Sequence, residues 1–310
     1  MFEYTHNNHF RFGYDGAWFV TPGDYHHTWQ AEPGRCTRGP RTFDVECRRA
    51  AKLICQNSPG LVPNIAFSGG IDSEIVVRTF MSIGIPFQVI IYKYANELNL
   101  HDISFAISFC EEHKIDYELK HVDVLAFWES EEFYNLADEI KCVSPQLCTH
   151  LHFFEPLKDG LLIIGQGEGC VIDLTAYEHM EGNRVYSEPR WHTVETERNN
   201  AMYRYFIQRK QKAIPAFFRY TPELIYSFLA DSTIQDLVAG KYPGYMTSQA
   251  LKFEIYKKYF PDLRPRPKFH GFERIIDAEQ RLRRNLTNRL PNYTRRVCVP
   301  YDKAMSHLKP

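Results

Sequence analysis

One short stretch of this sequence has residue types typical of a binding or catalytic site: two glycines followed closely by an aspartate and a serine. The stretch is residues 65–74, Ile-Ala-Phe-Ser-Gly-Gly-Ile-Asp-Ser-Glu. Gly69 and Gly70 permit backbone angles and close approaches that a Cβ would block. Asp72 and Ser73 follow at once, where a helix is expected to begin. Amides at a helix start, beside glycines and hydroxyls, bind anions well, so the stretch predicts a cradle for a phosphate.

The residues on either side predict a buried strand before this turn and a helix after it. A short apolar run at 64–67 follows Pro63, as expected of a strand. Gly84 and Pro86 supply the signals that end a helix. The apolar residues between recur near helical spacing: Ile75, Val76, Phe80 and Met81.

The pattern Ser-Gly-Gly-x-Asp-Ser at 68–73 resembles the signature of the PP-loop ATP pyrophosphatases. That family includes the synthetase domain of asparagine synthetase, GMP and NAD synthetases, and several tRNA-modifying enzymes. The stretch lacks the lysine followed by Ser or Thr of the better-known phosphate loop. The resemblance implies that ATP is cleaved between its α and β phosphates and that Asp72 positions Mg²⁺. The residues implied to hold pyrophosphate are Ser68, Gly69, Gly70, Ile71, Asp72 and Ser73. Family analogy places adenine near the ends of the first two strands, so the backbone around Phe67 and Ile91 is expected to line its pocket.

A second glycine-rich turn follows the apolar run Leu161-Leu162-Ile163-Ile164. It contains Gly165 and Gly167 and resembles the place where asparagine synthetases have Gly-x-Gly-x-Asp-Glu, whose acid helps to hold magnesium. No Asp-Glu pair follows the glycines here. Glu168 and Asp173 are the nearest carboxylates, and either could meet Mg²⁺, which takes one or two carboxylates together with phosphate oxygens. A glycine turn with solvated acids is the alternative.

The third candidate is a basic segment at 264–272, Arg-Pro-Arg-Pro-Lys-Phe-His-Gly-Phe. Its prolines keep the chain extended, so it could reach across a site. It resembles the Arg-x-Lys-x-Gly-Phe segment late in asparagine synthetases, with one extra residue before Gly-Phe. The resemblance implies that Lys268, with Arg266, steadies the departing pyrophosphate, where negative charge develops. A solvated basic loop is the alternative.

Cys148 and His152 would share one face of a helix, so a metal site or a Cys–His nucleophile pair is a hypothesis for them. We favour a structural role, because no fourth ligand is evident and two phenylalanines follow. The eight cysteines include no Cys-x-x-Cys pair, which weakens a zinc ribbon or a metal cluster. We interpret them as reduced thiols of a cytoplasmic protein, since the N-terminus does not resemble a signal peptide.

Strands and helices alternate through the middle of the chain, which predicts an α/β protein whose parallel sheet has helices on both faces. The resemblance implies an adenine nucleotide alpha hydrolase-like core. The expected strands are 86–92, 116–122 and 161–164, in addition to the one before the loop. The expected helices are 42–56, 102–114, 131–141, 145–158, 194–212, 222–238, 246–259 and 273–290, with Thr42 and Asp102 as N-caps. Tyr14-Asp15-Gly16 predicts a hairpin turn near the N-terminus.

Three regions are expected along the 310 residues. They are an N-terminal β element with a helix at 1–60, the α/β core at 61–170 and a helical region at 171–310. Residues 170–193 are irregular and polar, which suggests a lid or plain disorder. From Arg264 onward twelve basic residues face four acidic ones, a net charge of +8 that leaves −9 elsewhere, because the whole chain carries −1. Such asymmetry indicates an anionic partner at the C-terminal end.

The resemblance to PP-loop enzymes implies an AMP-forming ligase, and we expect it to adenylate a carboxylate or carbonyl oxygen of a small-molecule acceptor. An amine or ammonia would then displace AMP. Phe2 stands where a glutaminase domain has its catalytic cysteine, and about sixty residues precede the loop, too few for that domain. A tRNA- or other nucleic-acid-modifying enzyme and a catalytically silent nucleotide-binding regulator are the alternatives. No apolar run reaches the roughly 18 residues of a membrane helix, so we expect no membrane partner.

Overall fold

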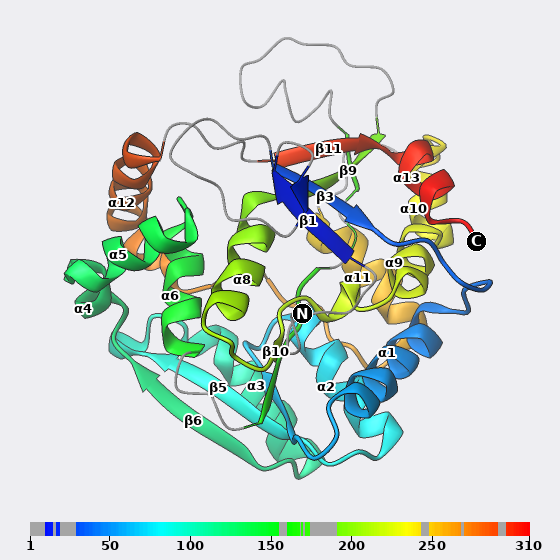
Figure 1. Ribbon diagram of the computed structural model, residues 1–310. Helices are drawn as coiled ribbons and strands as arrows, with labels where there is room; N and C mark the ends of the chain where they lie inside the picture. Colours follow the sequence, from blue (N-terminus) through cyan, green and yellow to red (C-terminus); the bar gives the residue numbers. More distant parts are fainter. Residues whose placement is uncertain are drawn as a thin grey trace.

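Five parallel strands form the central sheet in the described part of the chain (Figure 1). The computed structural model describes residues 10–14, 17–18, 29–154, 160–167, 169, 171–173, 191–242, 248–267, 270–290 and 296–310. Across the sheet the strands are β10 Ala213–Ile214, β7 Leu161–Ile164, β4 Pro63–Ala66, β5 Gln88–Tyr94 and β6 Tyr117–Val122. The chain runs outward from β4 to β6 and then returns to the other side of β4 as β7. Ligands of open α/β sheets bind beyond the carboxyl ends of the strands at such a switch point.

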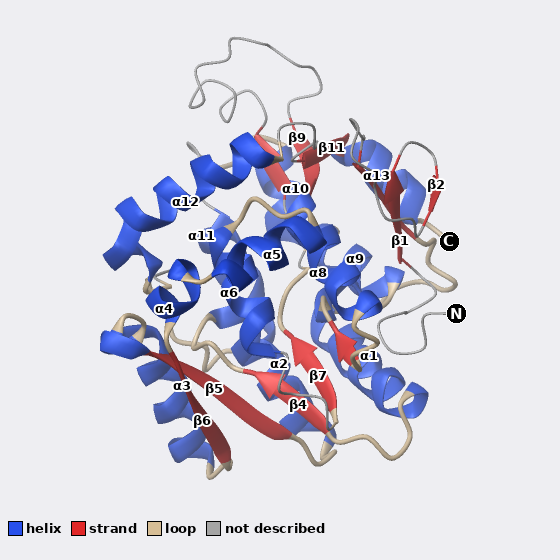
Figure 2. Ribbon diagram, turned by 60° about the vertical axis from the view of Figure 1, so that its left-hand side comes forward, coloured by secondary structure: helices blue, strands red, loops and turns tan. Residues whose placement is uncertain are grey.

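Alternate strand residues face two separate apolar cores, one on each side of the sheet. Ile65 and Ile163 pack into the first core, and Ile90 and Leu162 pack into the second. The first is covered by α1 Phe43–Asn57, α2 Ile71–Ile83, α3 Leu100–His113, α9 Pro222–Leu229, α10 Ser232–Val238, α11 Ser248–Tyr259 and α13 Tyr301–Leu308. The second is covered by α4 Val124–Glu129, α5 Glu131–Ile140, α6 Pro145–Phe154, α8 Glu197–Gln208 and α12 Ile276–Arg289. A parallel sheet with helices on both faces is therefore confirmed (Figure 2).

Two small antiparallel sheets lie outside this core. One orders its strands β2-β1-β3, with β1 Phe10–Tyr14, β2 Ala17–Trp18 and β3 Trp29–Pro33. The other is ordered β11-β9-β8, with β8 Val171–Asp173, β9 Trp191–Thr196 and β11 Arg296–Pro300. Antiparallel pairing of β1 with β2 confirms the expected hairpin, although Asp15 and Gly16 lie outside the described residues.

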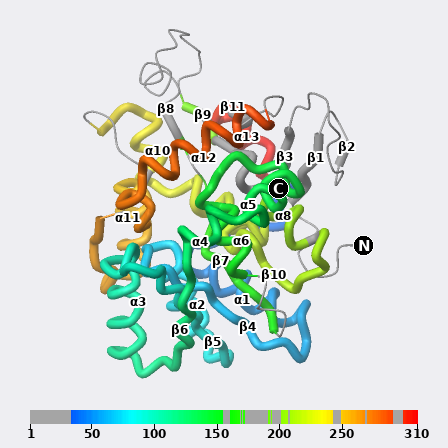
Figure 3. Tube along the Cα trace, turned by 90° about the vertical axis from the view of Figure 1, so that its left-hand side faces the viewer, coloured from blue at the N-terminus to red at the C-terminus, as the bar shows by residue number. Residues whose placement is uncertain are grey.

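The last helix, α13, lies beside β9 and β11 (Figure 3) and is bonded to the segment that precedes α1. The backbone N–H of Cys36 donates to the Leu308 carbonyl oxygen at 2.9 Å. His307 Nε2 donates to the Pro33 carbonyl oxygen at 2.7 Å. The last helix is thereby fastened to the segment that leads into α1.

Three expectations for secondary structure are wrong in detail. Residues 194–196 belong to strand β9 and not to a helix, because they pair with β11 a hundred residues later. The helix expected at 222–238 is broken in two, since Asp231 caps α10 by accepting from the Thr233 N–H at 2.8 Å. Asp102 is not an N-cap, because α3 begins two residues earlier with Asn99 at the N-cap position. The short helical turns are η1 Ala95–Glu97, η2 Phe217–Arg219 and η3 Phe272–Ile275.

Within the described residues, no helix is both long and apolar enough to cross a membrane. Of residues 170–193, expected to form a lid or to be disordered, residues 170 and 174–190 lie outside the described residues.

Candidate functional site

The glycine loop joins the end of β4 to the start of α2, as its sequence predicts. The first helical hydrogen bond runs from the Glu74 N–H to the Gly70 carbonyl oxygen at 3.1 Å. The amides of residues 71–73 precede that bond and have no helical acceptor, so they offer donors to a ligand. Ser68 Oγ and Ser73 Oγ lie 3.2 Å apart, and Ser73 Oγ donates to the Gly70 carbonyl at 2.9 Å. Amides and hydroxyls therefore gather at the helix N-terminus, where the helix dipole favours an anion.

Glycine is required at two places where this loop meets other elements. Gly69 has φ +89°, and a Cβ there would lie 2.0 Å from the Asp102 carbonyl oxygen at the start of α3. A Cβ on Gly165 would lie 2.8 Å from Ser73 Cα. The two glycine-rich turns singled out in the sequence are thus packed against each other, one after β4 and one after β7.

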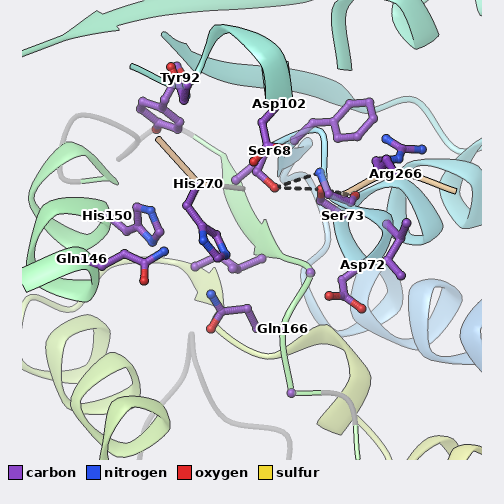
Figure 4. Close-up of a pocket in the computed structure, with 18 of the residues that line it drawn as sticks. Ser68, Asp72, Ser73, Tyr92, Asp102, Gln146, His150, Gln166, Arg266 and His270 are labelled. Carbon is purple, nitrogen blue, oxygen red and sulfur yellow. Dashed lines mark hydrogen bonds between the residues drawn. The ribbon is translucent and has the colours of Figure 1, made fainter. Parts of the chain in front are cut away.

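The loop opens into a cavity of about 420 Å³ beyond the ends of β4, β5 and β7 (Figure 4). That volume lies within the range of small-molecule sites. Aromatic side chains wall part of it: Phe67, Tyr92, Tyr94, Phe153 and Phe154. Other polar side chains line another part: Asn99, Gln146, His150, Gln166, Gln249 and His270. Gln146 and His150 come from α6, four residues apart, and Gln166 comes from the turn after β7. The cavity therefore combines an anion-binding rim with apolar walls and hydrogen-bonding groups.

Asp72 receives two donors from α11. Lys252 Nζ lies 2.6 Å from Asp72 Oδ2, and Tyr256 Oη donates to Asp72 Oδ1 at 2.8 Å. Lys252 and Tyr256 lie four residues apart, so they share one face of the helix. Lys252 also lines the cavity and is buried, which places a cation beside the loop.

Arg266 lines the cavity but bonds to the loop itself. Its guanidinium donates to the Gly69 carbonyl oxygen and forms an ion pair with Glu74. Glu74 also accepts from Arg78 Nε at 2.7 Å. Both terminal nitrogens of Arg266 are therefore engaged by the loop backbone and by α2, and the role expected for Arg266 on the leaving group stays a prediction.

Asp102 faces the cavity close to Ser68 in Figure 4. Burial raises the pKa of its carboxyl group to about 7, and the nearby charge of Glu273 adds to the rise. The Arg266 guanidinium acts in the opposite direction on that pKa. Asp102 is thus a carboxyl group placed to titrate near neutrality inside the cavity.

Most sequence-predicted residues meet at this cavity. Those that line it are Phe67, Ser68, Gly70, Ile71, Asp72, Ser73, Gly165, Gly167 and Arg266. Gly69 belongs to the same loop but is buried. Ile91 is buried in the first core, and its neighbour Tyr92 lines the cavity in its place. Lys268 and Glu168 lie outside the described residues, as does the side chain of Asp173, a backbone member of β8.

Several residues that line the cavity or contact Asp72 were missed from the sequence. Lys252 and Tyr256 sit in an ordinary helical pattern, and their only signal is a shared spacing of four. Gln146 and His150 have the same spacing, two residues before the Cys148 and His152 pair that drew notice. His152 instead stacks on Phe127, with ring centroids 4.0 Å apart, and Cys148 is buried in the second core. The structural reading of that pair fits these contacts.

Comparison with solved structures finds loosely similar chains. One is NMN synthetase from Francisella tularensis, 14% identical, covering 73% of this chain and 98% of that chain at a TM-score of 0.34. Another is NH3-dependent NAD synthetase from Campylobacter jejuni subsp. jejuni in complex with nitrate, 15% identical, covering 81% and 94%, at a TM-score of 0.32. No family model matches the chain, and no curated protein matches it. TM-scores this low carry no functional conclusion, and the fold class stands on the strand order and pairing themselves.

Proposed function

We propose that this chain is an ATP-dependent ligase of the PP-loop type that releases AMP and pyrophosphate. The observation that carries the proposal is the meeting of helix amides, two serine hydroxyls and Lys252 at the rim of one cavity. These donors suit a chain of phosphates, and the resemblance of residues 68–73 to the PP-loop signature selects the bond between the α and β phosphates. The aromatic and amide-lined remainder of the cavity has room for the other reactant.

The loop residues bind and orient the leaving group in this proposal. The N–H groups of residues 71–73 and the Ser68 hydroxyl donate to pyrophosphate oxygens, while the Ser73 hydroxyl donates to the Gly70 carbonyl oxygen and supports the loop. Lys252 supplies positive charge, which matters most as the α–β bond breaks and charge grows on the bridging oxygen. Lys252 is thus proposed to steady the leaving group, and the same role suggested for Lys268 stays a prediction, because Lys268 lies outside the described residues.

Asp72 is the described residue best suited to meet Mg²⁺ held by the phosphates. Carboxylate and phosphate oxygens are the ligands that Mg²⁺ prefers, and one or two carboxylates are enough. No group of three or more His, Cys, Asp or Glu side chains that could hold a metal is found within the described residues. A site completed by phosphate oxygens fits this arrangement. When bound, Mg²⁺ would neutralise phosphate charge, while Lys252 and Tyr256 keep Asp72 oriented toward the loop.

The acceptor is proposed to be a small molecule with a carboxylate or carbonyl oxygen that attacks the α-phosphate. An amine or ammonia then displaces AMP. Gln146, His150 and Gln166 lie away from the loop along the cavity wall and can donate to and accept from such a molecule (Figure 4).

The decisive experiment separates the products of ATP cleavage. Labelled ATP, Mg²⁺ and ammonium are incubated with a panel of carboxylic acids and carbonyl compounds, and AMP and ADP are resolved. We expect AMP and pyrophosphate. Ser68→Ala should lower their formation, whereas Ser104→Ala, on an exposed serine of α3, should not. ADP and phosphate as the only products would overturn the proposal.

A further inference from the structure

We propose that Arg266 is a positioning residue that locks the Gly69–Gly70 peptide in the orientation that turns an N–H group toward the cavity. This inference rests on the proposed function, because it concerns how the loop holds pyrophosphate. It replaces the direct contact with the leaving group that the sequence suggested.

Arg266 is held on several sides behind the loop. Its side chain is only 4% exposed, and one terminal nitrogen donates to the Gly69 carbonyl oxygen. The other terminal nitrogen pairs with Glu74, whose side chain is 2% exposed. The guanidinium carbon lies 4.8 Å from the centroid of the Phe105 ring in α3. These contacts leave the guanidinium little freedom to turn.

The orientation of the peptide follows from its planarity. In a trans peptide the carbonyl and the N–H group point in opposite directions. The Gly69 carbonyl points back to Arg266, so the Gly70 N–H points forward, where it donates to Ser68 Oγ with an N···O distance of 3.3 Å. Gly70 lines the cavity, whereas Gly69 is buried. Arg266 therefore determines which end of this peptide dipole a phosphate would meet.

A lock is needed because a peptide between two glycines turns over easily. Glycine accepts positive and negative φ almost equally, so little steric resistance opposes the rotation. A reversed peptide would present a carbonyl oxygen to the phosphates and repel them. Only an arginine fork can hold the Gly69 carbonyl and Glu74 together, because a lysine ammonium has no rigid pair of donors.

The test measures binding of inorganic pyrophosphate in the presence of Mg²⁺ by calorimetry. Arg266→Ala is expected to weaken binding by on the order of 10–100-fold, the range for losing a hydrogen bond to a charged group. Arg266→Lys should fall between Arg266→Ala and wild type. Arg264→Ala is the matched control, because Arg264 is 73% exposed and its nearest partner is Glu112 at 3.3 Å. It removes the same charge from the same segment without touching the loop.

A second measurement reports the peptide itself. With ¹⁵N-labelled glycine, pyrophosphate should shift the Gly70 amide signal in wild type and leave it nearly unchanged in Arg266→Ala. Thermal melting checks that the variants are folded. If Arg266→Ala does not fold, Glu74→Gln replaces it as the test variant. That variant removes one anchor of the guanidinium and should weaken binding less.

The outcomes separate this inference from the proposed function. Absence of pyrophosphate binding by the wild-type protein would overturn the proposed function. Wild-type binding with equal affinity in Arg266→Ala would overturn the lock alone. Equal losses in Arg266→Ala and Arg264→Ala would also overturn it, because the effect would then be one of net charge.

Discussion

Lys252 is a buried cation whose ammonium reaches the loop through Asp72 Oδ2 at 2.6 Å. Its helix, α11, lies 180 residues further along the chain than Asp72. A cation fixed in this way loses little freedom on meeting an anion, and its benefit grows as negative charge develops on the leaving group.

We therefore expect Lys252→Ala to lower single-turnover AMP formation by on the order of 10²–10³-fold at saturating ATP. ATP affinity, measured separately, should fall much less. Lys252→Arg should recover part of the rate, because the charge survives while its reach and geometry change. Lys257→Ala is the control, since Lys257 lies on the same helix and is exposed. An unchanged rate in Lys252→Ala would remove this lysine from the reaction.

Asp102 should make stability depend on pH. Its pKa is about 7 in the folded protein against 3.8 in the reference state. The folded protein therefore keeps a proton here that the unfolded chain releases between those values. The resulting stabilisation is complete below about pH 4 and is lost as pH rises through about pH 7.

Asparagine at position 102 cannot ionise. The melting temperature of Asp102→Asn should therefore rise relative to that of the wild-type protein by a few degrees between about pH 4.5 and pH 8. Melting curves across that range test the expectation. Asp116→Asn, at an exposed position before β6, is the control. A constant difference between Asp102→Asn and wild type would show that Asp102 does not titrate in this window. In that case His101, whose Nε2 lies 3.7 Å from Asp102 Oδ1, and Glu273 are the ionisable neighbours to substitute next.

At the scale of elements, the site depends on how closely the two glycine-rich turns approach. The turn after β7 touches the first turn of α2 at Ser73, where a Cβ on Gly165 would meet the backbone. The amides of α2 and the side chains beyond β7 can line one cavity only while that contact remains this short.

Gly165→Ala should therefore push the two turns apart. We expect a loss of about 1–3 kcal/mol in the free energy of unfolding, the usual range for overpacking. Pyrophosphate binding should weaken as well. Gly39→Ala is the control, because nothing lies within 4 Å of its added Cβ. Denaturant unfolding and calorimetry measure the two effects, and wild-type values for both would show that the contact yields without cost.

At the scale of the whole molecule, the described part of the basic C-terminal region packs against the rest of the protein. Leu282 and Leu286 of α12 are buried in the second core, and β11 pairs with β9. Some of its arginines are engaged: Arg266 with Glu74, Arg283 with Glu279 and Arg289 with Asp138. Arg281 and Arg284 are exposed on α12. Deleting this region would expose apolar side chains, so point substitutions are the better probe of an anionic partner.

A nucleic-acid partner for this region stays a proposal, and exposed arginines make it testable. If bulk tRNA binds, affinity should fall steeply with salt, and replacing both Arg281 and Arg284 by alanine should reduce the slope of log affinity against log salt by about 1.4–1.8. A Lys52→Ala and Lys257→Ala double variant removes equal charge from exposed positions elsewhere. No binding at low salt would retire this partner and favour the small-molecule acceptor.

Strand β4, the glycine loop and helix α2 could be predicted from the sequence alone, because short-range interactions determine them. Backbone stereochemistry acts within a few residues, so two glycines, an apolar run before them and a helical spacing after them were enough to predict the turn. The second glycine turn after β7 and the two-sided parallel sheet followed from the same kind of local pattern. Even the left-handed end of α2 at Gly84, with φ 65°, was signalled by its glycine.

Only the tertiary structure decided which distant side chains complete the site. Lys252 and Tyr256 reach Asp72 from 180 and 184 residues away in sequence, and the contact of Arg266 with Gly69 spans 197 residues, although Arg266 itself was named from the sequence. No local pattern distinguishes such a lysine from an ordinary helical one. Likewise β9 depends on pairing with β8 and with the distant β11, and strand alternation turns the Ile91 side chain into the core while its neighbour Tyr92 lines the cavity. Long-range packing determines these contacts, because each depends on where the sheet brings separate segments together.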